Sequence, residues 1–596
     1  MQKLFIYNNY LDTRLDYNDL LELQYTKPVV NSGGGTRGNK KWKTLIHNGV
    51  LFYPEYQSHN IPIKYDSEPI YLNPDAEEFI TYYVNKRFDK YRNDRFNRNF
   101  FNDWKKLLSH ELKKRITEFS RCNFDDIKRY VELTSEQKSE IRKTISKEDR
   151  ESKKKKNELS KDKYTFAMVD GSKQAIDNFL VEPPTIFVGR GLHPLSGCIK
   201  KRLRPEDITI NVSTEMKIPV PCVINTDGDV VELPNTQWGE IISDDTLEWI
   251  ASWQNNVTQK YNYARFGRKS SFKMKSDEDK YDKARLLKKK IKRIREKNEK
   301  NMSSDNKETR QLATCLFLID RLALRVGNEK KSTEADTIGV TTLKNKNVIL
   351  LENNILKIDF LVKDSIRYLN KVKIPDIVYN NIKEFHDDPE KKPSDELFEL
   401  VNSDTLNKYI KQFMRILTCK IFRTFNASYT MQGELNKIFL KYKDYDKPDM
   451  LQRIHYEYEI ANLKVAKLCN HQKESTKTSG VQLEKVQSKI TDIQSKINKL
   501  KRIKLKRVTE GKSVKTVNAK ISKLQGKLKI EKSKKSLKTQ SVSLSSGTSK
   551  QNYIDPRITI AFLKKMEIFD NVQLFFNSSM LKQFEWAMDV DENFRF

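Results

Sequence analysis

The chain has 596 residues, of which 112 are Lys or Arg and 80 are Asp or Glu, giving a formal net charge of +32. This length exceeds what one hydrophobic core organises, so several domains are expected, and 37% hydrophobic residues are enough to fill them. The cationic excess predicts a polyanionic partner, with nucleic acid favoured over an anionic membrane surface. The sequence contains no run of about 18 apolar residues, so a membrane-spanning helix is not expected. Its first residues lack the apolar region of a secretion signal.

Cysteine and histidine are sparse and scattered along the chain. None of the six cysteines belongs to a Cys-x-x-Cys pair, and the seven histidines show no metal-ligand spacing. This usage suits a reducing compartment and predicts neither a disulfide framework nor a zinc site. A GxxxxGK(S/T) phosphate-binding loop is also missing from the sequence. The sequence therefore shows neither a metal-ligand motif nor a phosphate-binding loop of this type.

The N-terminal part opens with a head, residues 1–38, that contains the flexible glycine-rich stretch 31–35. Short aromatic strands and then three helices are predicted beyond it. The first helix begins at Pro74, since proline is favoured at a helix start, and the last begins near Ser135 and is almost wholly charged. The predicted ranges are 39–63 for the strands and 74–91, 96–112 and 134–163 for the helices.

Residues 167–253 change character, because their Pro, Gly and β-branched residues predict strands and turns. Within them Gly189 and Gly191 flank Arg190, and glycines let a backbone approach a phosphate closely. An ordinary glycine turn with an exposed arginine is the alternative. A basic cluster follows and favours a clamp on a nucleic-acid backbone. Its members are Lys200, Lys201, Arg202 and Arg204.

The middle of the chain predicts helices around a buried core. Residues 279–301 have the pattern of a basic amphipathic helix. Residues 311–325 are apolar almost all round, so they predict a buried helix that stops at Gly327. Arg325 therefore lies where a core helix ends. A buried arginine needs a partner, which is either an acidic residue or a ligand phosphate.

Three strands and two further helices follow. Lys363 and Asp364 fall in the tight turn between the last two strands, where a lysine either enters a groove or stays solvated. The first helix carries Arg423, and the second ends just before His471. The predicted ranges are 348–351, 356–361 and 366–372 for the strands, and 409–429 and 454–470 for the helices.

Residues 472–545 form a separate basic module. Apolar residues recur there with alternating spacings of three and four in two runs, which are interrupted near Gly511. Two such seams predict an antiparallel helical hairpin, and a dimerising coiled coil is the alternative. The hairpin is favoured because the second arm follows after a short turn. The module holds 21 Lys and Arg against 5 Asp and Glu, so its net charge of +16 is half that of the chain.

A short polar stretch, residues 549–557, contains Tyr553 and leads into an apolar run. The step from Asp555 to Pro556 disfavours helical geometry at the aspartate, so Tyr553 is expected at a turn and outside a helix. A tyrosine held in this way on a basic chain is able to attack a phosphodiester. A packing tyrosine beside a helix is the alternative reading.

Eight peptides of the chain resemble, in order, the eukaryotic-type DNA topoisomerase IB family. The resemblance covers roughly residues 39–596. In the first half it rests on NRNFFNDWKK (97–106), EPPTIFVGRGLHP (182–194) and KRLRPEDITIN (201–211). In the second half it rests on RLALRVGNEK (321–330), KDSIRYLNKV (363–372), FRTFNAS (422–428), LCNHQ (468–472) and GTSKQNYIDPRIT (547–559).

The resemblance implies a role for each of five residues. Tyr553 matches the nucleophile, and Arg325 and Arg423 match the arginines that bind the non-bridging oxygens of the scissile phosphate. Lys363 matches the general acid for the leaving 5′ oxygen, and His471 matches a donor to a non-bridging oxygen. Fixed guanidinium groups stabilise the charge of a pentacoordinate phosphorus without a metal, and a tyrosine ester conserves the bond energy for resealing.

Further positions are implied to contact DNA. Arg190, Asp364 and Asn552 match residues around the cut site and the camptothecin pocket of the family. Lys200, Lys201 and Arg202 are expected to contact the duplex as well. Val362 stands where animal members have glycine, which bears on drug sensitivity more than on catalysis.

The implied fold is a multidomain α+β protein. A mixed cap covers the DNA, and a mainly helical catalytic domain of the tyrosine-recombinase/topoisomerase IB type follows. A helical-hairpin linker then leads to a small helical C-terminal domain with the tyrosine. The expected domains are a head (1–38), the cap (39–257), the catalytic domain (258–471), the linker (472–545) and the C-terminal domain (546–596).

The expected activity is relaxation of supercoiled duplex DNA through a 3′-phosphotyrosyl intermediate, in replication and transcription, by a monomer clamped round the duplex. A tyrosine site-specific recombinase and a non-enzymatic basic nucleic-acid-binding protein are the alternatives. The expected compartment is the nucleus for a cellular eukaryote, and the virion or the site of viral replication for a virus. Lys153 to Lys156 are either an import signal or a solvated helix face.

Overall fold

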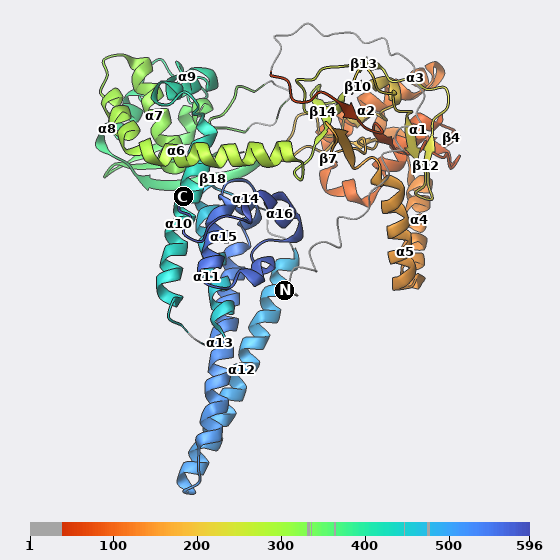
Figure 1. Ribbon diagram of the computed structural model, residues 1–596. Coiled ribbons are helices and arrows are strands. Elements are labelled where there is room, and N and C mark those ends of the chain that lie inside the picture. Colours follow the sequence, from red (N-terminus) through yellow and green to blue (C-terminus); the bar gives the residue numbers. More distant parts are fainter. Residues whose placement is uncertain (1–38, 331–333, 335–336, 363–364, 446, 474–476) are drawn as a thin grey trace. The chain divides into compact units, whose positions relative to one another are not determined.

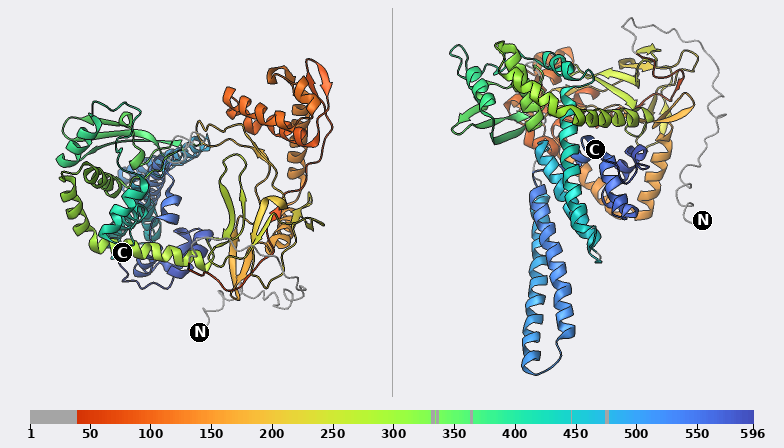
Figure 2. Two further views of the ribbon diagram at one scale, coloured as in Figure 1. Left: turned by 90° about the horizontal axis from the view of Figure 1, so that it is seen from above. Right: turned by 60° about the vertical axis from the view of Figure 1, so that its left-hand side comes forward.

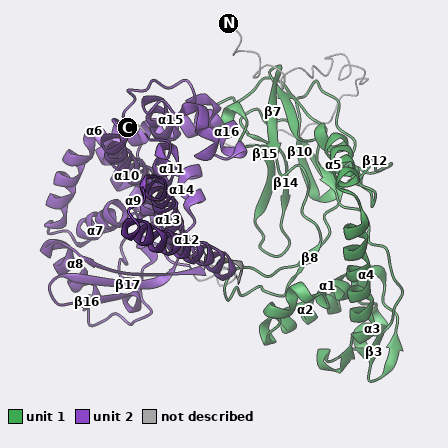
Figure 3. Ribbon diagram, turned by 90° about the horizontal axis from the view of Figure 1, so that it is seen from below, with its two compact units in different colours: residues 1–273, 332–335 green, residues 274–331, 336–596 purple. Residues whose placement is uncertain are grey.

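The computed structural model describes residues 39–596 except 331–333, 335–336, 363–364, 446 and 474–476. The chain divides into two compact units, which Figure 3 shows in separate colours. Unit 1 comprises the residues up to Lys273 together with 332–335, and unit 2 comprises 274–331 and 336–596. Within the described ranges, no helix has the length and apolar content that crossing a membrane requires.

Unit 1 is built on a seven-stranded sheet in the order β1-β6-β7-β15-β14-β10-β13, in which only β10 and β13 pair in parallel. One core packs against it and includes Trp42, Trp238 and Trp253. The strands predicted within 167–253 are therefore confirmed. The bounds are β1 (Leu45–Ile46), β6 (Phe166–Val169), β7 (Ser172–Asp177), β10 (Ile208–Asn211), β13 (Glu240–Ile242), β14 (Trp249–Gln254) and β15 (Tyr261–Phe266).

Three smaller sheets complete the strands of unit 1. They are ordered β12-β11-β2, β4-β3-β5 and β8-β9. All eight are two or three residues long, and β2 and the start of β3 fall within the short strands predicted over 39–63. The bounds are β2 (Leu51–Phe52), β3 (Ile63–Tyr65), β4 (Glu68–Ile70), β5 (Cys122–Asn123), β8 (Thr185–Ile186), β9 (Ile199–Lys200), β11 (Cys222–Ile224) and β12 (Val230–Glu232).

The first helices of unit 1 enclose an aromatic core. Phe96, Phe100 and Trp104 recur every four residues on α2 and are fully buried. The predicted helix 74–91 is too long, because α1 ends at Tyr83 and Asn85 caps a separate 3₁₀ turn. The second predicted helix is likewise broken before His110. The bounds are α1 (Pro74–Tyr83), α2 (Asp94–Leu107) and α3 (His110–Arg115).

Two exposed charged helices replace the single one predicted over 134–163. They are α4 (Asp125–Thr144) and α5 (Lys147–Asp162). The predicted helix start at Ser135 is wrong, because this residue lies inside α4. The break lies at Ser146, whose hydroxyl accepts the Asp149 N–H at 3.0 Å and caps α5. Lys153 to Lys156 lie on α5 with exposed side chains.

Unit 2 is mainly helical around one large core (Figure 1). Its three strands form an antiparallel sheet in the order β16-β17-β18, as predicted. The helices are α6 (Ser271–Met302), α7 (Lys307–Leu322), α8 (Asp376–His386), α9 (Ser403–Phe413), α10 (Cys419–Tyr442), α11 (Met450–Leu468), α14 (Ser546–Asn552), α15 (Pro556–Lys565) and α16 (Ser578–Gln583). The strands are β16 (Val348–Leu351), β17 (Ile355–Val362) and β18 (Ile366–Lys373).

Two helix predictions in unit 2 need correction. The core helix α7 ends at Leu322, where Ala323 adopts φ +49° and turns the chain, so Arg325 lies beyond the helix. The predicted helix 409–429 is two helices, α9 and α10, separated by 414–418. No Gly or Pro marks that break. The Asn407 side chain accepts the Cys419 N–H at 3.1 Å, which is a tertiary contact that no local pattern reveals.

The predicted helical hairpin is present within one chain. Helices α12 (Lys477–Thr509) and α13 (Lys515–Ser541) run side by side, and Gly511 turns the chain with φ +67°. Figures 1 and 2 show the pair extending away from the rest of unit 2. Ile497, Val517 and Ile521 are buried in the seam between the helices, as the heptad spacing predicts.

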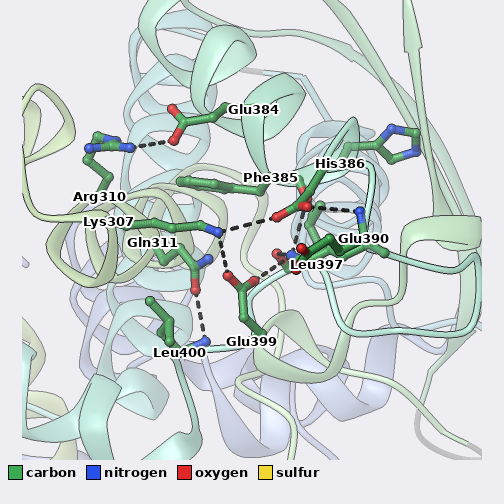
Figure 4. Close-up of polar contacts among 12 residues, drawn as sticks. Lys307, Arg310, Gln311, Glu384, Phe385, His386, Glu390, Leu397, Glu399 and Leu400 are labelled. Carbon is green, nitrogen blue, oxygen red and sulfur yellow. Dashed lines mark hydrogen bonds and ion pairs between the residues drawn. The ribbon is translucent and has the colours of Figure 1, made fainter.

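A cluster of charges ties the first turn of α7 to the segment that follows α8 (Figure 4). The Lys307 ammonium lies 2.9 Å from the Glu399 carboxylate and 3.5 Å from that of Asp388. Lys391 also pairs with Glu399 and donates to the Leu397 carbonyl at 3.0 Å. The Glu399 carboxylate therefore binds two lysines from separate segments and links α7 to the segment after α8.

Candidate active site

Arg423 is the most constrained side chain of the site. It projects from α10 and is only 5% exposed. Its Nη1 donates to the Ala323 carbonyl at 2.6 Å, and its Nη2 donates to the Cys469 carbonyl at 2.7 Å. The Nε atom is buried and makes no hydrogen bond to any described residue. An unsatisfied buried donor costs about 1–3 kcal/mol, so this geometry favours an acceptor supplied by a ligand.

Arg325 lies beside Arg423 at the wall of the same hollow. Its carbonyl accepts the Val340 N–H at 2.9 Å, which fixes the chain after α7. Both arginines line a cavity of about 200 Å³ that His471 and Thr548 also line. The same arginines line a neighbouring cavity of about 410 Å³ that includes Tyr553. Two guanidinium groups at one hollow make it a site for an anion, because each presents several donors and a permanent charge.

His471 follows α11 at a sharp turn. Asn470 adopts φ +50°, and the His471 N–H donates back to the Ala466 carbonyl at 2.8 Å. The ring Nδ1 lies 2.8 Å from the Ser549 hydroxyl, and Nε2 lies 3.3 Å from the Arg423 Nη2. Burial, reinforced by the charges of Arg423 and Arg325, lowers the pKa of His471 to about 3. The imidazole is therefore neutral at pH 7.

Tyr553 follows the short helix α14 and is held against these groups. Its ring centroid lies 5.1 Å from that of His471 and 5.1 Å from the guanidinium carbon of Arg423. Its N–H donates to the Ser549 carbonyl at 3.0 Å, and its carbonyl accepts the Ser428 hydroxyl at 3.0 Å. The Ser428 hydroxyl also accepts the Asp555 N–H, so α10 holds the tyrosine turn from both sides.

The turn after Tyr553 is anchored by a buried ion pair. Asp555 caps α15 by accepting the Arg557 N–H, and its carboxylate also pairs with the Arg557 guanidinium at 2.9 Å. Burial raises the pKa of Asp555 despite this partner. Arg557 reaches Asp282 on α6 at 2.8 Å. The predicted turn at Tyr553 is confirmed, and the polar residues before it, from Ser546 to Asn552, form the helix α14.

Comparisons with known proteins show the family of the chain. The family models of eukaryotic DNA topoisomerase I match the chain three times: the DNA-binding fragment over 40–266, the catalytic core over 269–504 and the C-terminal domain over 518–596. DNA topoisomerase 1 of Homo sapiens is 35% identical over 93% of this chain and 72% of its own length. The chain belongs to the eukaryotic DNA topoisomerase I family.

Plant and nematode relatives show the same likeness. DNA topoisomerase 1 beta of Arabidopsis thaliana is 39% identical over 94% of this chain, and the Caenorhabditis elegans DNA topoisomerase 1 is 36% identical over 92%. The chain spans about 60% of the length of the Arabidopsis relative and 67% of the nematode one.

The structure of this family member brings four of the five predicted catalytic residues together. Tyr553, Arg325, Arg423 and His471 all line one or both of the two cavities. Lys363, and Asp364 beside it, lie outside the described residues. No group of three or more His, Cys, Asp or Glu side chains suited to a metal ion occurs in the described part of the chain.

The other predicted DNA contacts are found in both units. Asn552 is the last residue of α14 and is exposed, and its amide donates to the Thr548 carbonyl at 3.1 Å. In unit 1, Arg190 lies between Gly189 and Gly191, whose φ angles of +62° and +58° confirm a turn that favours glycine.

The basic cluster of unit 1 makes ion pairs within the protein at two of its three predicted DNA contacts. Arg202 is largely buried and pairs with Glu78 at 2.6 Å, and Lys200 pairs with Glu182. Any contact of these two side chains with DNA competes with those ion pairs. Lys201 is exposed.

Sequence reasoning missed the residues that hold the site in place. Ser428 and Ser549 are fully buried and bind the backbone or ring of predicted site residues. Lys330 and Lys420 line the larger cavity and add positive charge there. Both serines lie within the peptides that carry the family resemblance, yet a serine has no spacing signal of its own. Only the folded chain shows what each serine contacts.

Proposed function

We propose that the chain is a type IB DNA topoisomerase that relaxes supercoiled duplex DNA by cutting and resealing one strand. The observation that carries the proposal is the packing of Tyr553 against Arg423 and His471 at hollows lined by two arginines. A nucleophile beside an anion site is the arrangement that transesterification of a phosphodiester needs. The family membership and the human and plant relatives named DNA topoisomerase 1 support it.

The proposed reaction proceeds through one covalent intermediate. The Tyr553 oxygen bonds to phosphorus and gives its proton to water, while the bond from phosphorus to the 5′ oxygen breaks. Lys363 protonates that leaving oxygen as general acid. Arg325 and Arg423 stabilise the charge on the non-bridging oxygens, and His471 donates a hydrogen bond to one of them. Attack by the free 5′ hydroxyl reverses every step, so the 3′-phosphotyrosyl bond conserves the energy for resealing.

The reaction needs neither ATP nor a metal ion in this scheme. One phosphodiester is exchanged for another of similar energy, so no fuel is consumed. The positive charge that a metal would supply comes from the guanidinium groups, and Arg423 is already held in place by two carbonyls.

The finer architecture belongs to the same proposal. Residues 39–257 form a cap over the duplex, 258–471 a catalytic domain of the tyrosine-recombinase type, 472–545 a linker and 546–596 the domain that carries the nucleophile. A monomer clamps the DNA between them and uses contacts such as Arg190, Lys201 and Asn552. The basic surfaces of the cap and of the linker slow the rotation of the free strand. The nucleus is the proposed compartment, in keeping with the eukaryotic relatives.

The decisive experiment is relaxation of a supercoiled plasmid in EDTA without ATP. The full chain is expected to relax it, and Tyr553→Phe, which removes only the attacking oxygen, is expected to be inactive. Tyr429→Phe is the matched control, because Tyr429 is exposed on α10 and lies outside the hollows. Detergent quenching should trap nicked plasmid bound to protein with the wild type and with the control only.

Two results would point to the alternatives. Strand exchange between two defined sites would indicate a recombinase. DNA binding without relaxation by the wild type would indicate a basic binding protein, for which Tyr553→Phe changes nothing measurable.

A further inference from the structure

The His471 ring has a hydrogen-bond partner on each nitrogen, and neither partner is acidic. Nδ1 faces the Ser549 hydroxyl at 2.8 Å, and Nε2 faces the Arg423 Nη2 at 3.3 Å. Ser549 has no exposed surface and His471 has 5%. Both contacts therefore lie in a water-poor setting where each hydrogen bond fixes the direction of a proton.

The chemistry of these partners decides which nitrogen carries the proton in the free protein. A guanidinium group has donors only, so Nε2 must accept from Arg423 and cannot carry the proton. The ring is neutral, because two nearby arginines and burial disfavour a charged imidazole. Nδ1 therefore carries the proton and donates it to the Ser549 oxygen. This is the opposite of the tautomer that a donor to a phosphate oxygen at Nε2 requires.

We propose that Ser549 is a positioning residue that supports His471 in either tautomer and so lets the ring switch when a phosphodiester enters the cavity. The inference rests on the proposed function for the role of His471. A serine hydroxyl both accepts and donates. It accepts from Nδ1–H in the free protein, and it donates to a bare Nδ1 once Nε2 carries the proton and faces a phosphate oxygen. The ring takes one proton from solvent water at Nε2 and releases the Nδ1 proton to solvent water, so its charge stays the same.

Ser549 also links this switch to the nucleophile. Its backbone carbonyl accepts the N–H groups of Tyr553 and Ile554, both at 3.0 Å. In addition, the His471 carbonyl accepts the Ser545 N–H at the start of α14. The histidine and the tyrosine are thus held by one short helix, through bonds that use backbone atoms and not the Ser549 side chain.

The tautomer can be read directly by ¹⁵N NMR of the full chain labelled at histidine. The three forms, Nδ1–H, Nε2–H and doubly protonated, have distinct pairs of nitrogen shifts, and His471→Gln assigns the signal by removing it. We expect Nδ1–H in the free protein at pH 7. We expect Nε2–H after a duplex oligonucleotide is added to Tyr553→Phe, which binds without turnover.

Each arm of this measurement can overturn the inference separately from the proposed function. An Nε2–H ring in the free protein contradicts the assigned hydrogen bonds, whatever the protein does to DNA. A doubly protonated ring, or an unchanged Nδ1–H ring, in the DNA complex contradicts the switch. If the wild type relaxes no plasmid but its free ring is Nδ1–H, the proposed function fails and the Ser549 contact stands.

Kinetics of variants then test the role of the hydroxyl. Ser549→Ala should slow single-turnover cleavage roughly 10- to 100-fold with little change in DNA affinity, because the ring loses its orientation and not its charge. Ser549→Thr keeps a hydroxyl and should recover most of the rate. Ser579→Ala, at an exposed serine of α16, is the control. Equal losses for Ala and Thr, or a loss in affinity alone, would contradict the proposal.

Discussion

At the scale of single residues, the site depends on donors that are fixed before any substrate arrives. Arg423 uses two of its nitrogens on the carbonyls of Ala323 and Cys469, and these residues follow α7 and α11. The guanidinium is therefore oriented by the fold and does not reorganise when charge develops near it. This arrangement explains why the buried Arg423 pairs with no carboxylate among the residues that the structure describes.

Arg423→Lys should lower single-turnover cleavage roughly 10²- to 10³-fold, as loss of one fixed oxyanion donor does. A lysine ammonium keeps the charge, but its three donors radiate from one nitrogen, whereas the guanidinium offers donors from three separate nitrogens in one plane. Quench-flow cleavage of an oligonucleotide duplex measures the effect. Arg415→Lys is the matched control, since Arg415 is exposed in the segment between α9 and α10. Wild-type rates for Arg423→Lys would show that charge alone suffices.

At the scale of elements, the charge cluster between α7 and the segment after α8 makes stability depend on pH. Burial favours the protonated form of Glu399, but the hydrogen bonds from Lys391 and Lys307 outweigh it and lower its pKa to about 2. Because the folded pKa lies below the ordinary value of 4.5, the carboxylate stabilises the fold above about pH 4.5. That stabilisation is lost as the pH falls from there toward 2.

Glu399→Gln should therefore lower the free energy of unfolding at pH 7 by about 1–2 kcal/mol, allowing for solvent screening of this partly exposed group. The difference from the wild type should shrink below pH 4. Thermal unfolding by calorimetry between pH 3 and 7 measures both effects. Glu390→Gln, at an exposed glutamate of the same segment, should leave the profile unchanged. A constant difference at every pH would show that the effect is not electrostatic.

The hairpin of α12 and α13 owes its shape to a thin apolar seam. Ile497 is 1% exposed at its centre, whereas Ile503 near the tip is 47% exposed. Ile497→Ala should lower the free energy of unfolding of the hairpin by about 2–4 kcal/mol, the usual effect of truncating a core isoleucine. Amide hydrogen exchange of the two helices should accelerate accordingly. Ile503→Ala should change it little, and equal effects of the two substitutions would contradict the seam.

At the scale of the whole molecule, the charge is distributed unevenly along the chain. Residues 472–545 hold +16 of the total +32, and this range includes α12 and α13, which extend from the rest of unit 2. DNA affinity should weaken steeply with salt, because each neutralised phosphate releases counterions.

Replacing residues 480–540 by a short Gly-Ser turn should reduce the slope of log K against log salt and alter processivity. Cleavage of a short duplex should change little, since Tyr553, Arg325, Arg423 and His471 all lie outside the hairpin. Binding titrations at several salt concentrations and plasmid time courses test the two parts. Equal losses of cleavage and relaxation would show that the hairpin also serves the chemistry.

The sequence by itself determined much of this protein. Heptad spacing predicted the hairpin, and strand alternation predicted the β16-β17-β18 sheet. Eight peptides indicated the family and contained four described residues that line two neighbouring cavities. These features depend on local periodicity or on residue types within short peptides. A stretch of a few tens of residues therefore contains all the information that predicts each of these features.

Only the tertiary structure decided how the site is held. The Arg423 carbonyl partners lie 100 and 46 residues away, and Ser549 lies 78 residues from His471. The end of α7 at Leu322 and the break before Cys419 likewise follow from packing and caps, with no glycine or proline at either point. A hydrogen bond between distant segments leaves no periodic trace in the sequence, because its geometry exists only after both segments pack on the same core.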